Sequence, residues 1–449
     1  MAAHAGLLRQ APEVNGSAAT LARRLAAVRA QTLALAAPLS EADCQVQSMP
    51  DASPVKWHLA HTTWFFETFV LERFEPGFRP WHPAFRVLFN SYYQGVGEQH
   101  ARPARGLLTR PSLAEVRAWR TSVDERLQAL LAAAPRGQGA AIAALVELGL
   151  QHEQQHQELI LTDLLHLLSC NPLAPAYADA PPPAVHDAVA PGGWTACEGG
   201  LVDIGHAGAG FAFDNETPRH RVFLRPFALA DDLVTQGDWR AFMADGGYDE
   251  PRWWLAAGWD WRRAQGIAAP LYWRRDGGAD DGPWHRFTLR GLLPLDDAAP
   301  VVHVSAYEAD AYARWHGARH GAPHRLPTEA EWEHVAERAG PAAVAGACCI
   351  EAAALLPLPP SAAQGAAAPR QLFGEVWQWT ASAYQAYPGF RAWDGAVGEY
   401  NAKFMVNQLV LRGGSCATPR SHLRTSYRNF FPPEARWQFS GLRLARDLA

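Results

Sequence analysis

The sequence predicts an α+β protein in three parts: an N-terminal four-helix bundle (residues 1–170), a linker (171–191) and an irregular α+β domain (192–449). Apolar residues recur every three or four positions in the first part, which is typical of amphipathic helices. Repeated prolines crowd the linker, and they stop both helices and central strands. From Gly192 onward, short β-like pieces are separated by Gly, Pro, Asp and Trp. We therefore expect a domain with little regular structure, in which large aromatic side chains pin the loops.

Four helices are expected in the first part, over residues 21–39, 53–75, 112–131 and 142–168. Ser53 and Pro54 suit the N-cap and the first turn of the second helix. Ser112 and Glu115 have the spacing of a capping box at the start of the third. Helices of this number and length favour an up-and-down bundle.

The last part contains two further helical stretches, near residues 306–316 and 328–337. The remainder is expected to form short strands and loops. Residues 339–370 are rich in alanine, and we expect this segment to be a surface excursion.

The composition argues against nucleic-acid and membrane partners. The chain of 449 residues has a formal net charge of −5 and no long run of Lys and Arg, so it lacks the basic surface that nucleic acid requires. No stretch of about 18 uninterrupted apolar residues occurs. The N-terminus lacks the basic and apolar regions of a signal peptide. These features predict a cytoplasmic protein.

The most informative stretch is His152-Glu153-Gln154-Gln155-His156, inside the fourth expected helix. Residues four apart project from one face of a helix, so the two imidazoles can bind one metal ion. The stretch also satisfies the H-E-x-x-H pattern of zinc peptidases, in which the intervening glutamate is the general base. Two buried histidines satisfied by hydrogen bonds are the non-functional alternative. The sequence thus predicts a metal site without naming the metal.

Three motifs in the last part resemble, in order, the signatures of the formylglycine-generating-enzyme (sulfatase-modifying) fold. They are Arg325-Leu-Pro-Thr-Glu-Ala-Glu-Trp-Glu333, Gly374-Glu-Val-Trp-Gln-Trp-Thr380 and Arg412-Gly-Gly-Ser415. With a DinB-like bundle before them, they make the chain similar to the iron-dependent sulfoxide synthases of ergothioneine biosynthesis. The resemblance covers roughly residues 20–449. It implies a DinB-like four-helix bundle followed by an irregular formylglycine-generating-enzyme/C-type-lectin-like α+β domain.

The resemblance also implies an Fe(II) ion held by three histidines. The segment Ser53–Thr62 resembles the one that delivers the first ligand in the family, with His61 at the matching position. His152 and His156 match the other two ligands. His58 is the competing candidate, and is otherwise a core residue or a partner of a ligand. An octahedral ion bound by three imidazoles keeps up to three positions open.

The implied reaction uses dioxygen to join the sulfur of cysteine, or of γ-glutamylcysteine, to an imidazole carbon of hercynine (Nα-trimethylhistidine), giving a sulfoxide. A thiolate and an imidazole can both bind the metal beside dioxygen. The loop around residues 90–106 resembles the branch of the family that accepts free cysteine, which favours cysteine as the donor. Carbon–selenium bond formation on the same scaffold, as in selenoneine synthases, is left open, and so is the oligomeric state.

Two pairs of residues in this loop match functional positions of the family. Tyr93, with Tyr92 as the alternative, matches the catalytic tyrosine, whose phenol can donate a proton or a hydrogen atom. Arg102 and Arg105 match the loop that binds the thiol substrate, and their planar guanidinium groups suit its α-carboxylate. Without the resemblance, we would assign the tyrosines to packing and the arginines to the surface.

Three further residues are candidates for binding hercynine. Gln155 lies one turn from His152, so its amide can reach the imidazole of a bound histidine derivative. Asn429 matches a family position near the same substrate. Phe430, beside it, offers an aromatic face to the trimethylammonium group.

The chain departs from the formylglycine-generating enzymes at the second and third motifs. Glu375 and Gln378 stand where related proteins often show Asn and Glu, which puts an ion-binding role of that turn in doubt. Cys416 has no second cysteine beside it in the C-terminal stretch, which argues against formylglycine generation.

Two rival functions follow from the residues alone. The first is a zinc hydrolase that uses Glu153 as its base, although the chain does not continue the longer H-E-x-x-H-x-x-G-x-x-H pattern. The second is a binding module without enzymatic activity, in which the histidines are structural.

Overall fold

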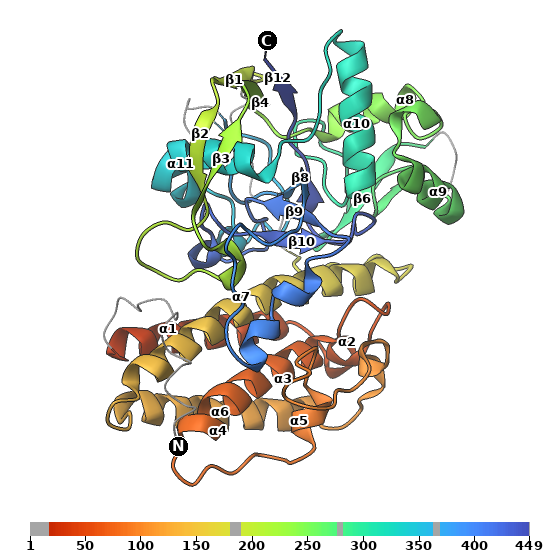
Figure 1. Cartoon of the computed structure of the whole chain (residues 1–449). Helices are drawn as coiled ribbons and strands as arrows, with labels where there is room; N and C mark the ends of the chain where they lie inside the picture. Colours follow the sequence, from red (N-terminus) through yellow and green to blue (C-terminus); the bar gives the residue numbers. More distant parts are fainter. Residues whose placement is uncertain (1–17, 180–189, 276–281, 362–368, 449) are drawn as a thin grey trace. The chain divides into compact units, whose positions relative to one another are not determined.

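The computed structural model describes residues 18–179, 190–275, 282–361 and 369–448, which form two compact units (Figure 1). Unit 1 joins Met1–Cys170 with two later segments, Ala207–Asp214 and Arg391–Lys403. Unit 2 contains Asn171–His206, Asn215–Phe390 and Phe404–Ala449. Half of the expected linker, residues 180–189, lies outside the described residues. The helical N-terminal part and the mixed helix and sheet that follow confirm the predicted α+β class.

Unit 1 is built on four long helices: α1 (Ala18–Ala36), α3 (Val55–Phe66), α6 (Leu113–Ala132) and α7 (Gly139–Ser169). Helices α1 and α3 each contact both α6 and α7 (Figure 1). Shorter elements connect them: α2 (Glu41–Gln45), the π-helical turn η1 (Glu67–Leu71), α4 (Glu72–Phe74), α5 (Phe85–Leu88) and the 3-10 turn η2 (Arg102–Leu107). Every residue of α3 is buried. A helix that is buried on all sides can place polar groups only where they find partners or a ligand.

One predicted cap is confirmed and one is wrong. Ser112 and Glu115 form the expected capping box, since the Ser112 hydroxyl accepts from the Glu115 N–H and the Glu115 carboxylate accepts from the Ser112 N–H. Helix α3 instead begins at Val55 with Pro54 at the N-cap, and no side chain caps it. The Ser53 hydroxyl is used elsewhere, because it accepts a hydrogen bond from Arg105 at 2.9 Å.

The described residues of unit 2 form four small sheets with the strand orders β1-β4-β12, β10-β9-β8-β11, β2-β3 and β5-β6-β7. All named pairings are antiparallel except that of β11 with β8. The strands are β1 (Trp194–Cys197), β2 (Gly200–Ile204), β3 (His220–Leu224), β4 (Phe227–Ala230), β5 (Trp273–Arg275), β6 (Trp284–Thr288), β7 (Gly291–Pro294), β8 (Trp377–Ala383), β9 (Leu409–Arg412), β10 (Asn429–Phe431), β11 (Ser440–Gly441) and β12 (Ala445–Asp447).

The α-helices that accompany these sheets, within the part of unit 2 that the structure describes, are α8 (Gln236–Ala244), α9 (Ala256–Gln265), α10 (Ala306–Arg319) and α11 (Glu329–Ala345). Helices α10 and α11 confirm the two helical stretches expected from the sequence. Helix α11 is kinked at Gly340, which has a positive φ of 69° and precedes Pro341. The kink explains why the helical pattern in the sequence ends near residue 337.

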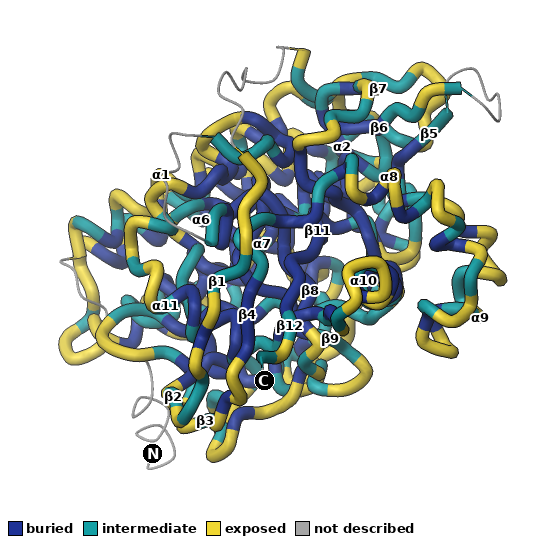
Figure 2. The backbone as a smooth tube through the Cα atoms, turned by 90° about the horizontal axis from the view of Figure 1, so that it is seen from above, coloured by how far each residue is buried: buried dark blue, intermediate teal, exposed yellow. Residues whose placement is uncertain are grey.

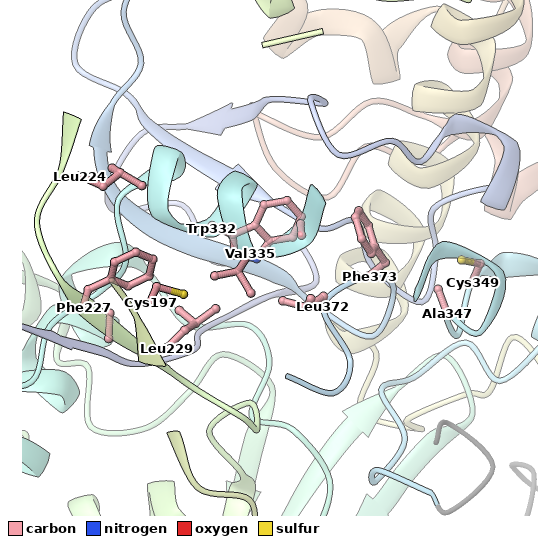
Figure 3. Packing of buried hydrophobic residues seen from close by; sticks show 12 residues of the cluster. Cys197, Leu224, Phe227, Leu229, Trp332, Val335, Ala347, Cys349, Leu372 and Phe373 are labelled. Carbon is pink, nitrogen blue, oxygen red and sulfur yellow. The ribbon is translucent and has the colours of Figure 1, made fainter. Parts of the chain in front are cut away.

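A hydrophobic cluster in unit 2 lies between α11 and β4 (Figure 3). Trp332 and Val335 of α11 pack with Phe227 and Leu229 of β4, and Leu372 and Phe373 extend the cluster. Buried positions also follow β4, β8 and β11 (Figure 2).

The expected surface excursion at residues 339–370 is wrong in part. Residues 347–350 and 354–356 are buried, and Cys349 belongs to the hydrophobic cluster. The apolar Cys, Ile and Leu side chains among the alanines account for this burial. Residues 362–368 of the segment lie outside the described residues.

Among the described helices, none combines the length and the hydropathy that a membrane crossing requires.

Candidate metal centre

Three histidines from two helices of unit 1 converge on one point. His61 comes from α3, and His152 and His156 come from α7. One ring nitrogen of each lies within 4.8 Å of the corresponding atoms of the other two. All three residues are buried, with 0%, 1% and 8% of their surface exposed. The structure thus brings together the three residues that the sequence predicts as ligands.

Hydrogen bonds orient two of the rings toward this point. Nδ1–H of His61 donates to the Phe89 carbonyl at 2.6 Å, which leaves Nε2 with a lone pair. His156 Nδ1 lies 2.8 Å from His58 Nδ1, and His58 Nε2 lies 3.1 Å from a carboxylate oxygen of Asp163. Because Asp163 can only accept, His58 donates to it through Nε2 and accepts from His156 through Nδ1. Nε2 of His156 therefore also keeps its lone pair.

The remaining nitrogens have no competing partners. His61 Nε2 and both ring nitrogens of His152 are buried and make no hydrogen bond within the described part of the chain. A buried polar atom without a partner costs free energy unless a ligand satisfies it. Burial also lowers the pKa of all three imidazoles, to about 3 for His152 and well below the ordinary value for His61 and His156. Three neutral imidazoles with free lone pairs fit a divalent ion such as Fe(II) or Zn(II).

Aromatic rings surround the three imidazoles. Trp57 stacks on His61 with ring centroids 4.5 Å apart, and Trp64 lies against the same imidazole at 5.4 Å. The Phe65 ring is 4.7 Å from His152. The three imidazoles thus lie in an apolar, aromatic environment, in which electrostatic interactions are stronger than in water.

The two tyrosines of the predicted catalytic pair lie in the loop after α5. Tyr93 is 1% exposed, and its ring is 5.6 Å from Trp64, which in turn packs on His61. Tyr92 is partly exposed and stacks on Tyr93 at 4.7 Å. Burial, followed by the neighbouring phenols of Tyr92 and Tyr400, raises the pKa of Tyr93 well above its ordinary value. The Tyr93 phenol therefore keeps its proton at neutral pH.

Arg105 is a buried cation without an ion-pair partner. It is 3% exposed and donates to the hydroxyls of Ser53 and Ser91, at 2.9 and 3.1 Å. Its guanidinium carbon lies 3.4 Å from the centre of the Trp57 ring, and the same ring stacks on His61. Within the described residues, no carboxylate lies within ion-pair distance of it. Burial, followed by the charge of Arg102, lowers the pKa of Arg105 to about 9, so it remains charged at neutral pH.

Arg102 occupies a different environment from Arg105. It is exposed at the start of η2 and donates to the backbone carbonyl of Asp51. The sequence does not distinguish the two arginines, because the difference arises from how η2 packs on α3.

Comparisons with known proteins agree with this two-part architecture. A family model for the sulfatase-modifying factor enzyme 1-like domain matches residues 187–347 and 362–448, and one for the DinB superfamily matches residues 24–160. Hercynine oxygenase of Mycobacterium tuberculosis is 33% identical over 449 residues, covering 95% of this chain and 99% of the relative. Hercynine oxygenase of Mycolicibacterium thermoresistibile is 34% identical over 453 residues, covering 96% and 95%. The chain belongs to the hercynine oxygenase family.

Membership of the hercynine oxygenase family makes the chain an oxygen-dependent oxidoreductase. Ergothioneine biosynthesis protein 1 of Schizosaccharomyces pombe is a more distant relative, 27% identical over 53% of this chain and 28% of its own length.

Glu153, the base of the rival hydrolase, is engaged away from the three imidazoles of this hercynine oxygenase family member. Its carboxylate forms ion pairs with Arg120 and with Arg29, the latter at 3.0 Å, and accepts from the Thr32 hydroxyl at 2.6 Å. Burial raises its pKa, but the charges of Arg120 and Arg29 outweigh burial and hold the pKa at about 2. A carboxylate held this firmly is a poor acceptor for a proton from water, which disfavours the zinc hydrolase.

The three residues predicted near hercynine fall in both units. Gln155 is half-buried on α7, directly before His156. Asn429 and Phe430 begin β10 in unit 2, where Phe430 stacks on Tyr384 at 4.0 Å. Their contact with a substrate stays a prediction.

The segment Arg391–Lys403 belongs to unit 1, a place that the sequence did not predict. The Tyr400 ring lies 5.7 Å from that of His152 and 6.2 Å from that of Tyr92. The Glu399 carboxylate accepts from the backbone N–H groups of Gln94 and Gly95, at 2.9 and 2.6 Å. The only local signal is a run of polar and aromatic residues, and nothing in its spacing points to the helical bundle.

Proposed function

We propose that this protein is a non-haem Fe(II)- and dioxygen-dependent sulfoxide synthase that joins the sulfur of a thiol to the imidazole carbon of hercynine, as in ergothioneine biosynthesis. The convergence of three buried, neutral imidazoles with free lone pairs carries this proposal. The near full-length similarity to hercynine oxygenases supports hercynine as the substrate.

In this proposal His61, His152 and His156 hold the ferrous ion. When bound, the ion supplies open positions at which dioxygen is activated and a thiolate and an imidazole are brought together. The aromatic rings around the histidines exclude water from the reacting groups, and His58 with Asp163 keeps His156 in the ligating tautomer.

Arg105 is the proposed receptor for the carboxylate of the thiol substrate. A buried guanidinium without a counter-ion is costly, and a substrate carboxylate provides the missing negative charge. A guanidinium can bind a carboxylate through two parallel N–H···O bonds, which fixes orientation as well as position. Arg102, exposed in the same turn, is proposed to help admit the substrate. Cysteine is the favoured donor and γ-glutamylcysteine the alternative.

Tyr93 is the proposed proton donor, with Tyr92 as the alternative. The Tyr93 phenol is buried and packs on Trp64, which contacts His61, and its raised pKa keeps the proton in place until a strongly basic oxygen atom forms nearby. Gln155 is proposed to bind the imidazole of hercynine through its amide. Asn429 and Phe430 of unit 2 stay candidate hercynine-binding residues from the family resemblance, and an aromatic ring such as that of Phe430 suits a trimethylammonium group.

The proposal is tested with protein purified without oxygen and loaded with Fe(II). Oxygen uptake is measured with hercynine and either cysteine or γ-glutamylcysteine, and products are identified by mass spectrometry. We expect oxygen uptake that requires both hercynine and a thiol, and a sulfoxide product. Zinc-dependent peptide cleavage without oxygen uptake would instead identify a hydrolase.

Single variants test the ligand assignment. His61→Ala, His152→Ala and His156→Ala should each lose most of the bound iron. His166→Ala is the matched control, because His166 lies on the same helix as two of the ligands but bonds to Ser48. Undiminished iron in all three ligand variants would refute the assignment.

A further inference from the structure

We propose that unit 2 carries a second metal site, formed by His316, His320 and His324, that takes a divalent transition ion such as Zn²⁺. One ring nitrogen of each residue lies within 4.8 Å of those of the other two. The site shares no residue with the candidate centre in unit 1, and it does not depend on the proposed function.

The three histidines are brought together by the end of α10 and the turn after it. His316 lies in the last turn of α10, and His320 is its C-cap residue, so the two are on the same helix face. The chain reverses at Gly321, which has a φ of 68°, and returns His324 to the side of His316. A Cβ at Gly317 would lie 2.5 Å from the His324 backbone nitrogen. A glycine is therefore required for this close return.

The ring contacts leave nitrogen atoms available for an ion. His320 Nδ1 donates to the His316 carbonyl at 2.8 Å, which leaves its Nε2 as a ligand. His324 is only 6% exposed, yet its Nε2 has no hydrogen-bond partner among the described residues. His316 Nδ1 and His324 Nδ1 lie 2.7 Å apart and share one proton, so an ion that binds both rings replaces this hydrogen bond. A buried ring nitrogen without a partner is the type of atom that a bound ion satisfies.

The donor set selects the class of ion. All three donors are imidazole nitrogens, which favour Zn²⁺, Cu²⁺ or Ni²⁺ over the oxygen-seeking Ca²⁺ and Mg²⁺. His320 is exposed and stacks on His316 at 4.0 Å, so its ring must turn to face the ion, and water can fill the fourth position.

Ion binding at this site would fix the start of α11. The turn that carries His324 continues directly into Arg325, whose guanidinium binds the Glu331 carboxylate at 2.7 and 2.8 Å. Glu331 completes the capping box of α11 with Thr328. Helix α11 supplies Trp332 to the hydrophobic cluster of unit 2. An ion that holds the turn before this helix should therefore stabilise unit 2.

The test is a zinc titration of the full-length protein against a chromophoric chelator at neutral pH. His320→Gln and His324→Gln should each bind one fewer tightly held zinc than the wild type, with affinity for that zinc reduced at least about tenfold. His285→Gln is the matched control, because His285 is a half-buried histidine of unit 2 outside the cluster. It should leave the titration unchanged.

A second readout separates this site from the centre in unit 1. Cobalt(II) bound at His316, His320 and His324 should give visible absorption bands that persist in His61→Gln and disappear in His320→Gln. Because His320 is exposed, its replacement should not impair folding, and circular dichroism checks this. Zinc stoichiometry and affinity that match the wild type in both His320→Gln and His324→Gln would overturn the proposal.

Discussion

The tautomer of His156 is decided by two residues that do not themselves point at the metal centre. Asp163 accepts from His58, which obliges His58 to accept from His156. Such outer partners fix both the ring orientation and the basicity of a ligand. The weaker ligand candidate of the sequence analysis, His58, thus has a clear place as a positioning residue.

Replacing His58 by Leu should weaken Fe(II) binding by about 10–100-fold while leaving the fold intact, because the His156 ring loses the acceptor that orients it. Fe(II) affinity is measured by competition with a chelator under anaerobic conditions. His166→Leu provides the control on α7. Equal affinity in the His58 variant and the wild type would show that His156 does not need this partner.

Glu153 illustrates how a familiar motif can be used for another purpose. Its carboxylate is fully buried between Arg29 and Arg120, with which it forms ion pairs. Removing one partner of such a group leaves uncompensated buried charge. Glu153 therefore stabilises the helical bundle by pairing with an arginine of α1 and an arginine of α6.

Glu153→Gln should lower the free energy of unfolding by about 3–5 kcal/mol, measured by urea denaturation, because two buried guanidinium groups lose their counter-ion. Glu147→Gln is the matched control on the same helix. Glu147 pairs with Arg24, whose side chain is 44% exposed, so about 1 kcal/mol or less is expected. A Glu153 variant as stable as the control would contradict the structural role.

Arg391–Lys403 is the element that most changes the description of the metal centre. Glu399 binds the N–H groups of Gln94 and Gly95, and Lys403 donates to the carbonyl of Tyr92 and lies over its ring. These contacts fix the loop that carries the paired tyrosines. The segment thus acts on the proposed proton donor through the backbone on either side of it.

Glu399→Gln should raise hydrogen exchange at the amides of Gln94 and Gly95, because a neutral amide accepts their hydrogen bonds less strongly than a carboxylate does. Hydrogen–deuterium exchange with mass spectrometry measures this. Asp394→Asn, an exposed acid in the same segment, is the control and should leave exchange unchanged. Exchange in the Glu399 variant that equals the control would mean that the loop is held by other contacts.

Over the whole molecule, the sequence predicts features that depend on regular spacing within one helix. It does not predict contacts between segments that are far apart in the chain. The i, i+4 spacing of His152 and His156 is a local property of one helix, so it is visible in the sequence. The pairing with His61 came from the family resemblance, since no local pattern links α3 to α7. The unpaired state of Arg105 and the position of Tyr400 depend on contacts between distant segments, which leave no mark on either segment alone.

The cluster of His316, His320 and His324 is predictable from the sequence only in part. Its regular spacing of four is visible in the sequence. The third residue lies beyond the end of the helix, however, and joins the others only because Gly317 and Gly321 allow a tight return.

Removing iron from the protein should lower its stability. Binding of Fe(II) at a concentration 100 times its dissociation constant should add about 2.7 kcal/mol to the unfolding free energy of unit 1, because the ion binds only the folded arrangement. Thermal unfolding is followed under argon with and without a chelator. His152→Ala should abolish the chelator-dependent shift in the midpoint. A shift of equal size in that variant would place the stabilising ion elsewhere.

The segment Arg391–Lys403 lies far along the chain from the bundle that it completes. His61, His152 and His156 are synthesised long before Tyr400, and N-terminal regions generally fold first during synthesis. In a nascent chain the helices that carry the three histidines can therefore form while the loop of Tyr92 and Tyr93 still lacks its contacts with Glu399 and Lys403. The segment Arg391–Lys403, which holds this loop, is therefore synthesised after all three imidazoles, so the metal centre can complete its contacts with Tyr400 only after the bundle has formed.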